Sequence, residues 1–132
     1  MYYASGFAGA ATKRYAAVHA GSRIEGSSPH GLVKILFDEL LLAMDACALA
    51  MDQGDQHKAN DKHIRATSIL YALDSSLDFD KGGDIAISLA QIYRETRRLL
   101  LAAFDSRSSA DVRAARALIG EIADAWNAIG RT

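Results

Sequence analysis

The chain has 132 residues, of which half are hydrophobic, with one proline, one cysteine and a formal net charge of −1. This length suits a single domain with its own core, and the balanced charge argues against nucleic-acid binding, which favours a basic face. Abundant alanine and leucine with almost no proline favour long helices, so an all-α fold is expected. The lone Cys47 excludes an internal disulfide framework and, in an apolar stretch, is typical of a small core residue.

The first 27 residues are small and polar with scattered aromatic side chains. We interpret residues 1–27 as a mobile N-terminal arm or lid, with room for a short helix near Ala10–His19. The start "MYYASGFAGAATKRY" lacks the charged beginning and leucine-rich run of a secretory signal. No targeting segment is therefore expected.

The first predicted helix has Ser28 as its N-cap and Pro29 at its first position, where the missing N–H of proline is harmless. It runs to about Met51 and ends in "DQGD" around Gly54. The stretch is long enough to span a bilayer, but four charged side chains interrupt it, which hydrocarbon disfavours. No membrane insertion is expected.

Three further helical patterns follow. The second covers about residues 57–77, and "DFDKGGD" then interrupts it with two glycines and no means of continuing a helix. The third spans about residues 84–104, and the fourth begins at Ser108 or Ser109, has Asp111 in its first turn and lasts to about Ile129. Four helices with short links predict an antiparallel up-and-down four-helix bundle over residues 28–132.

The apolar faces of these helices differ in width. The third and fourth helices each have one apolar stripe, and the stripe of the third includes Ile85 and Phe104. The first helix is apolar nearly all round, except for one narrow charged strip: Lys34, Asp38, Asp45 and Asp52. A four-helix bundle has no central helix, so part of this surface should face outward. Either alanines exaggerate the width and the arm covers the rest, or the surface is a groove for a partner's amphipathic helix.

Patterns for catalysis or metal binding are weak. In "DFDKGGDIAISL" the acidic residues follow an EF-hand-like spacing, but Leu89 stands where the bidentate glutamate is required, so a polar turn is favoured. The histidines have no i,i+4 pairing that would suit a metal: His19, His30, His57 and His63. No nucleophile has an evident base beside it. We expect no cofactor, no metal and no enzymatic activity.

Several segments of the chain are similar to one known family. These are the start "MYYASG", the opening "SSPHGLVKILFDELL", the segment "NDKHIRATSILYALDSSLDFDKGGDIAISLAQIYRETRRLLLAA", and a fourth helix ending around Trp126. In this order and spacing they resemble the flagellar secretion chaperone (FliS) family over nearly the whole chain. The sequence departs from the family pattern at Glu39-Leu40, in place of a small Gly-Ala, and at Arg94-Glu95-Thr96, in place of an Asp-Tyr pattern.

The resemblance implies a function in the bacterial cytoplasm. It implies a non-enzymatic export chaperone that binds the C-terminal segment of flagellin, which becomes helical on the chaperone and is kept from premature polymerisation. The complex is then delivered to the export gate of the flagellar type III apparatus. It also implies that the arm covers the groove when flagellin is absent and contributes to export-gate docking, with Tyr2, Phe7 and Tyr15 as candidate residues. The free protein is expected to be a monomer or weak homodimer.

The candidate groove lies on the broad face of the first helix. Its proposed residues are Ile35, Phe37, Leu41, Leu42 and Met44. Each of these could instead pack inside the bundle, and for Phe37 this alternative weighs at least as much. The rival function is a structural helical bundle that buries the same face in a homodimer.

Overall fold

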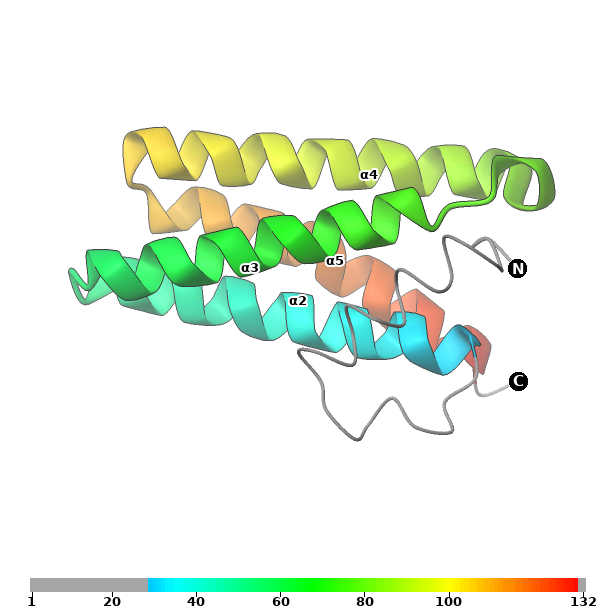
Figure 1. The fold of residues 1–132 in the computed structure, drawn as a ribbon, viewed down its shortest axis with the longest axis horizontal. Helices are drawn as coiled ribbons and strands as arrows, with labels where there is room; N and C mark the ends of the chain where they lie inside the picture. The colour runs from blue at the N-terminus through cyan, green and yellow to red at the C-terminus, as the bar shows by residue number, and fades with distance from the viewer. Residues whose placement is uncertain (1–28, 131–132) are drawn as a thin grey trace.

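The computed structural model describes residues 29–130, which form four long helices side by side in an up-and-down arrangement (Figure 1). They are α2 (Pro29–Asp52), α3 (Gln56–Ser75), α4 (Phe79–Ser106) and α5 (Ser109–Gly130). The expected all-α four-helix bundle is confirmed. The predicted arm of residues 1–27 and the predicted cap Ser28 lie outside the described residues.

The turn between α2 and α3 forms as the sequence indicates. Gly54 has a φ of +73°, a left-handed conformation that favours glycine. The N–H of Gly54 donates to the Met51 carbonyl at 3.2 Å, and the N–H of Asp55 donates to the Ala50 carbonyl at 2.9 Å. Asp55 then caps α3, because its side chain accepts a hydrogen bond from the Lys58 N–H. The short link thus satisfies the ends of both helices.

The start of α4 differs from the sequence prediction. The sequence predicts a break at "DFDKGGD" and a third helix from about residue 84, but α4 already begins at Phe79, because Asp78 acts as an N-cap and its side chain accepts a hydrogen bond from the Lys81 N–H at 3.0 Å. One helical turn forms, and Gly83 then breaks the regular backbone with φ 50° and ψ −128° before the helix resumes. A glycine at this position lets α4 begin at Phe79 instead of near residue 84.

The helices form a ring around one core. α2 packs against α3 and α5, and α4 packs against α5 but only sparsely against α3. Leucine, isoleucine and aromatic side chains from all four helices fill the centre. The largest fully buried side chains of the core are Tyr93, Phe37, Leu36, Leu40, Met44, Ile69, Leu70, Leu73, Leu100, Ile119, Val112 and Thr96.

Most of the wide apolar surface of α2 is buried inside the bundle. On one side Phe37 meets the ring of Trp126 in α5 edge-on, with centroids 6.2 Å apart. On the other side the Cys47 thiol donates to the Ala59 carbonyl of α3 at 3.4 Å. Two neighbours therefore cover two flanks of one helix, and the large apolar side chains of α2 that stay exposed are Leu42 and Leu49.

The charged strip of α2 is tied to α5. The Arg116 guanidinium lies 3.1 Å from the Asp45 carboxylate, and that of Arg113 lies 2.6 Å from Asp52. Hydrogen bonds from Arg113 and Ser109 lower the pKa of the Asp52 carboxyl group. Because both pairs are solvent-exposed, they set the register of the two helices more than they add stability.

At the opposite end of α2 an aromatic contact closes the bundle. The indole of Trp126 stacks on the His30 ring with a centroid distance of 4.3 Å and an interplanar angle of 5°. Its Nε1–H donates to the His30 carbonyl at 3.0 Å. One side chain near the end of α5 therefore fixes the first turn of α2 by both packing and a hydrogen bond.

The backbone at Gly83 gives a first testable prediction. Gly83→Ala should lower the free energy of unfolding by about 1–3 kcal/mol, because no L side chain readily adopts this φ and ψ. An added methyl group would meet no other atom within 4 Å, so the loss comes from the backbone alone. Urea unfolding followed by circular dichroism measures the change.

Gly120→Ala is the matched control within α5. Its added methyl group meets only the flexible end of the Arg116 side chain, at 3.0 Å, and alanine favours a helix by up to about 1 kcal/mol. Stability should therefore hold or rise. A Gly83→Ala variant as stable as the parent protein would contradict the described turn.

Candidate functional site

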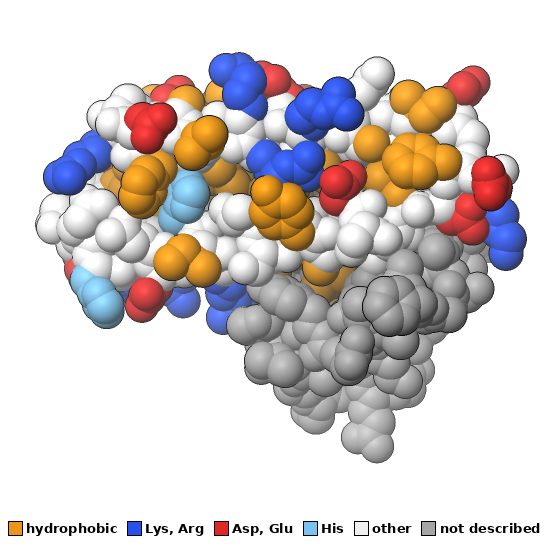
Figure 2. All heavy atoms as spheres, turned by 45° about the horizontal axis from the view of Figure 1, so that its top comes forward, with side chains coloured by type: hydrophobic (Ala, Val, Ile, Leu, Met, Phe, Trp, Pro, Cys, Tyr) orange, Lys and Arg blue, Asp and Glu red, His pale blue; other side chains and the backbone are white. Residues whose placement is uncertain are grey.

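The sparse packing between α3 and α4 leaves a groove on the outside of the bundle, with a volume of about 390 Å³. It is lined by His63, Thr67 and Tyr71 from α3 and by Arg94, Arg97, Arg98 and Leu101 from α4. Figure 2 shows this face of the molecule, on which apolar side chains lie among basic side chains and some acidic ones.

The two helices that form this groove carry large exposed apolar side chains, of which Tyr71 and Leu101 line the groove itself. Ile64 and Tyr71 on α3 are seven residues apart, so they lie on the same side of that helix, and both are exposed. On α4, Leu101 is 61% exposed and Phe104 is about half exposed. A cluster of exposed apolar groups of this kind usually marks a surface that binds another molecule.

His63 joins the two helices beneath the groove. Its Nε2 lies 2.7 Å from the Leu100 carbonyl of α4, and because a carbonyl can only accept, Nε2 carries the proton. The His63 ring also packs on Phe104, with ring centroids 5.4 Å apart. This contact holds α3 and α4 together where few other side chains do.

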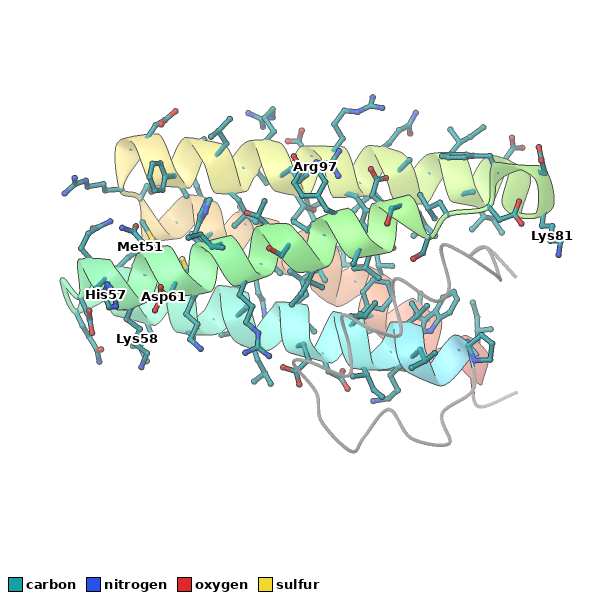
Figure 3. All side chains as sticks on the ribbon, viewed as in Figure 1. Met51, His57, Lys58, Asp61, Lys81 and Arg97 are labelled. Carbon is teal, nitrogen blue, oxygen red and sulfur yellow. The ribbon has the colours of Figure 1, made fainter. Side chains whose placement is uncertain are left out.

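Three arginines of α4 give the groove its charge. The Arg97 guanidinium lies 5.3 Å from the centre of the Tyr71 ring and 3.4 Å from the Asp74 carboxylate, and Figure 3 shows it between α4 and α3. Arg98 forms an ion pair with Glu95 at 2.6 Å, and its hydrogen bond lowers the pKa of Glu95. Within residues 29–130, no carboxylate lies within ion-pairing distance of Arg94.

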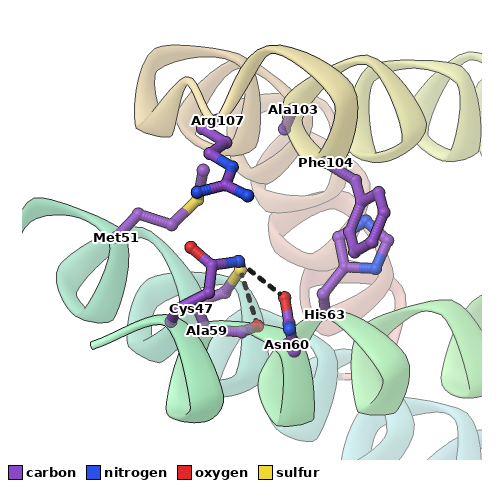
Figure 4. Close-up of a pocket in the computed structure, with 9 residues that line it drawn as sticks. Cys47, Met51, Ala59, Asn60, His63, Ala103, Phe104 and Arg107 are labelled. Carbon is purple, nitrogen blue, oxygen red and sulfur yellow. Dashed lines mark hydrogen bonds between the residues drawn. The ribbon is translucent and has the colours of Figure 1, made fainter. Parts of the chain in front are cut away.

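A second pocket, near the α2–α3 turn, is too small for a ligand. Its volume of about 10 Å³ is close to that of one water molecule (Figure 4). Burial raises the pKa of the Cys47 thiol that lines it, so this thiol is protonated and a poor nucleophile. The described part of the chain also has no group of three or more side chains placed to bind a metal ion. The α3–α4 groove is therefore the best candidate site.

Most of the residues predicted to line a groove on α2 are instead packed in or against the bundle core. Ile35, Met44 and the 1%-exposed Phe37 are buried in the core, and Leu41 is partly buried against it. Only Leu42, 61% exposed, projects fully from this helix. A partner that binds this conformation of the bundle can therefore contact Leu42 and part of Leu41, but not the other three.

Sequence reasoning missed the α3–α4 groove. It placed Ile85 and Phe104 on the buried stripe of α4, but both are exposed. The available signal was the spacing of Ile64 and Tyr71, which lie seven residues apart on a helix that needs only a narrow stripe to pack. The predicted arm residues Tyr2, Phe7 and Tyr15 lie outside the described residues.

Among the described helices, none has an apolar stretch long enough to cross a membrane.

Comparison with known proteins adds family information. The sequence model described as "Flagellar protein FliS" matches residues 11–132. The chain is 34% identical over 130 residues to the "Flagellar secretion chaperone FliS" of Salmonella typhimurium. The aligned residues cover 98% of this chain and 93% of the relative. The chain is 31% identical over 127 residues to the protein of the same name in Escherichia coli, covering 96% and 90% of the two chains. It is also 25% identical over 122 residues to "Flagellar secretion chaperone FliSB" of Pseudomonas aeruginosa, covering 90% and 94%.

The placement of Phe37 and Leu42 yields a paired prediction. Phe37→Ala should lower the free energy of unfolding by about 3–5 kcal/mol, because it removes a ring that is buried against Trp126. Leu42→Ala should change it by no more than about 0.5 kcal/mol, because that side chain is exposed. Thermal or urea unfolding measures both values, and similar losses in the two variants would contradict the described orientation of α2.

Proposed function

The chain belongs to the FliS family of flagellar secretion chaperones, and from this premise we propose that it binds the C-terminal segment of flagellin in the α3–α4 groove. The family assignment made from the sequence is thus confirmed, and a chaperone role in flagellar export follows from it. The finer steps are part of the proposal: the bound flagellin is kept from premature polymerisation in the bacterial cytosol and is delivered to the flagellar type III export apparatus.

The exposed apolar groove is the observation that carries this proposal. A segment that becomes helical on binding loses conformational entropy, so it must bury a large apolar surface in return. The residues that line the groove run from His63 to Tyr71 on α3 and from Arg94 to Leu101 on α4, which is about 10–12 Å at about 1.5 Å per residue. This length suits about two turns of an amphipathic partner helix, and binding of a helix in a groove is a common mode of recognition.

The mechanism is competitive burial. While the apolar face of the flagellin segment lies in the groove, the same face is not available to a second flagellin subunit. The chaperone needs no bond-making chemistry for this, and the proposal includes no cofactor. Release then requires only that the export apparatus binds the segment or the chaperone more favourably than they bind each other.

Calorimetry with a C-terminal peptide of the host flagellin tests the proposal. We expect saturable binding with a dissociation constant below about 50 µM, which corresponds to about −6 kcal/mol. Leu101→Gln should weaken binding at least about fivefold, because one apolar contact in the groove is lost. The matched control is Leu42→Gln, since Leu42 and Leu101 have the same 61% exposure on different helices.

Two outcomes would count against this assignment. If Leu42→Gln weakens binding and Leu101→Gln does not, the peptide binds the α2 face and not the α3–α4 groove. No binding at tens of micromolar, together with a concentration-dependent dimer in sedimentation, would favour the self-associating structural bundle instead.

We further propose that residues 1–27 compete with flagellin for the groove and contribute to docking at the export gate. The supporting features are the three aromatic residues Tyr2, Phe7 and Tyr15, which suit a groove with apolar walls. Deletion of residues 1–20 should tighten or accelerate binding of the flagellin peptide, as stopped-flow fluorescence can measure. An unchanged association rate and affinity would contradict the competition.

A further inference from the structure

The α3–α4 groove is lined by positively charged side chains and by no negatively charged one. We infer that the arginines of α4 select client helices that carry carboxylates beside their apolar face; this inference rests on the proposed function of the groove. The groove lining contains the guanidinium groups of Arg94, Arg97 and Arg98 and no carboxylate. The chain as a whole is nearly neutral, so this local excess of positive charge is a property of the groove and not of the overall composition.

The three arginines are not equivalent. Arg97 is already engaged, because it lies over the Tyr71 ring and near the Asp74 carboxylate. Arg98 pairs with Glu95 in the same helix, but this pair is exposed on both sides and can exchange for another carboxylate at little cost. Arg94 has no carboxylate partner among residues 29–130. Arg94 is therefore the principal contact for a client, and Arg98 the second.

The spacing along α4 places these charges beside the apolar contact. Arg94, Arg98 and Leu101 follow one another at intervals of four and three residues, so they form one row on the outward face of the helix. A client helix whose leucine packs on Leu101 would bring residues one turn away close to Arg98, and residues two turns away close to Arg94. Glutamate or aspartate at those client positions would complete the ion pairs.

In other parts of the bundle, arginines already serve internal contacts. Arg65 binds Glu39 at 2.6 Å, Arg113 binds Asp52 at 2.6 Å and Arg116 binds Asp45 at 3.1 Å, each joining two helices. Within residues 29–130, neither Arg94 nor Arg98 forms an ion pair with another helix, since the partner of Arg98 is Glu95 of α4 itself. Their charges are thus directed at whatever occupies the groove.

We expect the arginines to change which client helices bind more than they change how tightly a client binds. Each exposed ion pair contributes little, but two or three together amount to about a tenfold difference in affinity between acidic and basic clients. Such pairs also accelerate association at low salt and weaken as salt screens them. Burial of apolar surface supplies most of the binding free energy, and the arginines favour acidic over basic amphipathic helices.

A pair of designed peptides tests the inference with the full chain. Both are amphipathic helices of about 20 residues with the same leucine face, and the flanking positions carry either glutamate or lysine. By fluorescence anisotropy at low salt, the glutamate peptide should bind at least about tenfold more tightly than the lysine peptide. High salt should reduce this ratio, and the double variant Arg94→Glu/Arg98→Glu should reverse it.

A second double variant is the matched control. Lys58→Glu/Lys62→Glu changes the formal charge by the same amount, but on α3 and outside the groove lining. It should keep the preference for the glutamate peptide. If wild-type protein binds the two peptides equally or binds neither, or if both double variants change the preference alike, the inference is overturned.

The host flagellin peptide separates this inference from the proposed function. If it binds wild-type protein and Arg94→Glu/Arg98→Glu equally well, the selectivity is refuted and the flagellin assignment stands. If it does not bind at all while the designed peptides are still distinguished, the flagellin assignment fails and the selectivity of the groove stands.

Discussion

The structure depends on how the apolar circumference of α2 is shared between its two neighbours. Apolar surface that meets water is unfavourable, and α2 is apolar nearly all round. Its packing against α3 and α5 is accordingly the most extensive between any two helices of the bundle. The contact of Phe37 with Trp126 and that of Cys47 with Ala59 are the two sides of this arrangement. Because α3 is drawn against α2, and α4 against α5, the seam between α3 and α4 is the loosest of the four.

This loose seam explains why large apolar side chains stay exposed along it. A closely packed pair of helices would bury Tyr71 and Leu101 against each other, but here both stay exposed on the walls of a groove. His63 keeps the seam closed at its base through the Leu100 carbonyl, so the groove has a fixed floor. The groove thus lies where the packing between neighbouring helices is weakest, and it is there that we propose the client binds.

The sequence was sufficient for the fold and insufficient for the site. The four helices of the described residues 29–130 and the turn at Gly54 follow from local chemistry, which the sequence carries in full. The site depends on which face of each helix meets which neighbour, and periodicity does not contain that information. Phe37 shows this limit: its position on a broad apolar face suits a core and a groove equally, and only the place of Trp126 in the fold decides between them. The helical turn at Phe79 was missed for a similar reason, since a cap and a single glycine conformation were enough to form it.

The central claim is that the flagellin segment binds between α3 and α4. Methyl NMR of the full chain, titrated with the host flagellin peptide, tests it most directly because it reports each leucine and isoleucine separately. The account predicts that the methyl signals of Ile64 and Leu101 shift on binding, while those of Leu42 and Leu49 stay in place. Shifts confined to Leu42 and Leu49, with Leu101 unchanged, would contradict it.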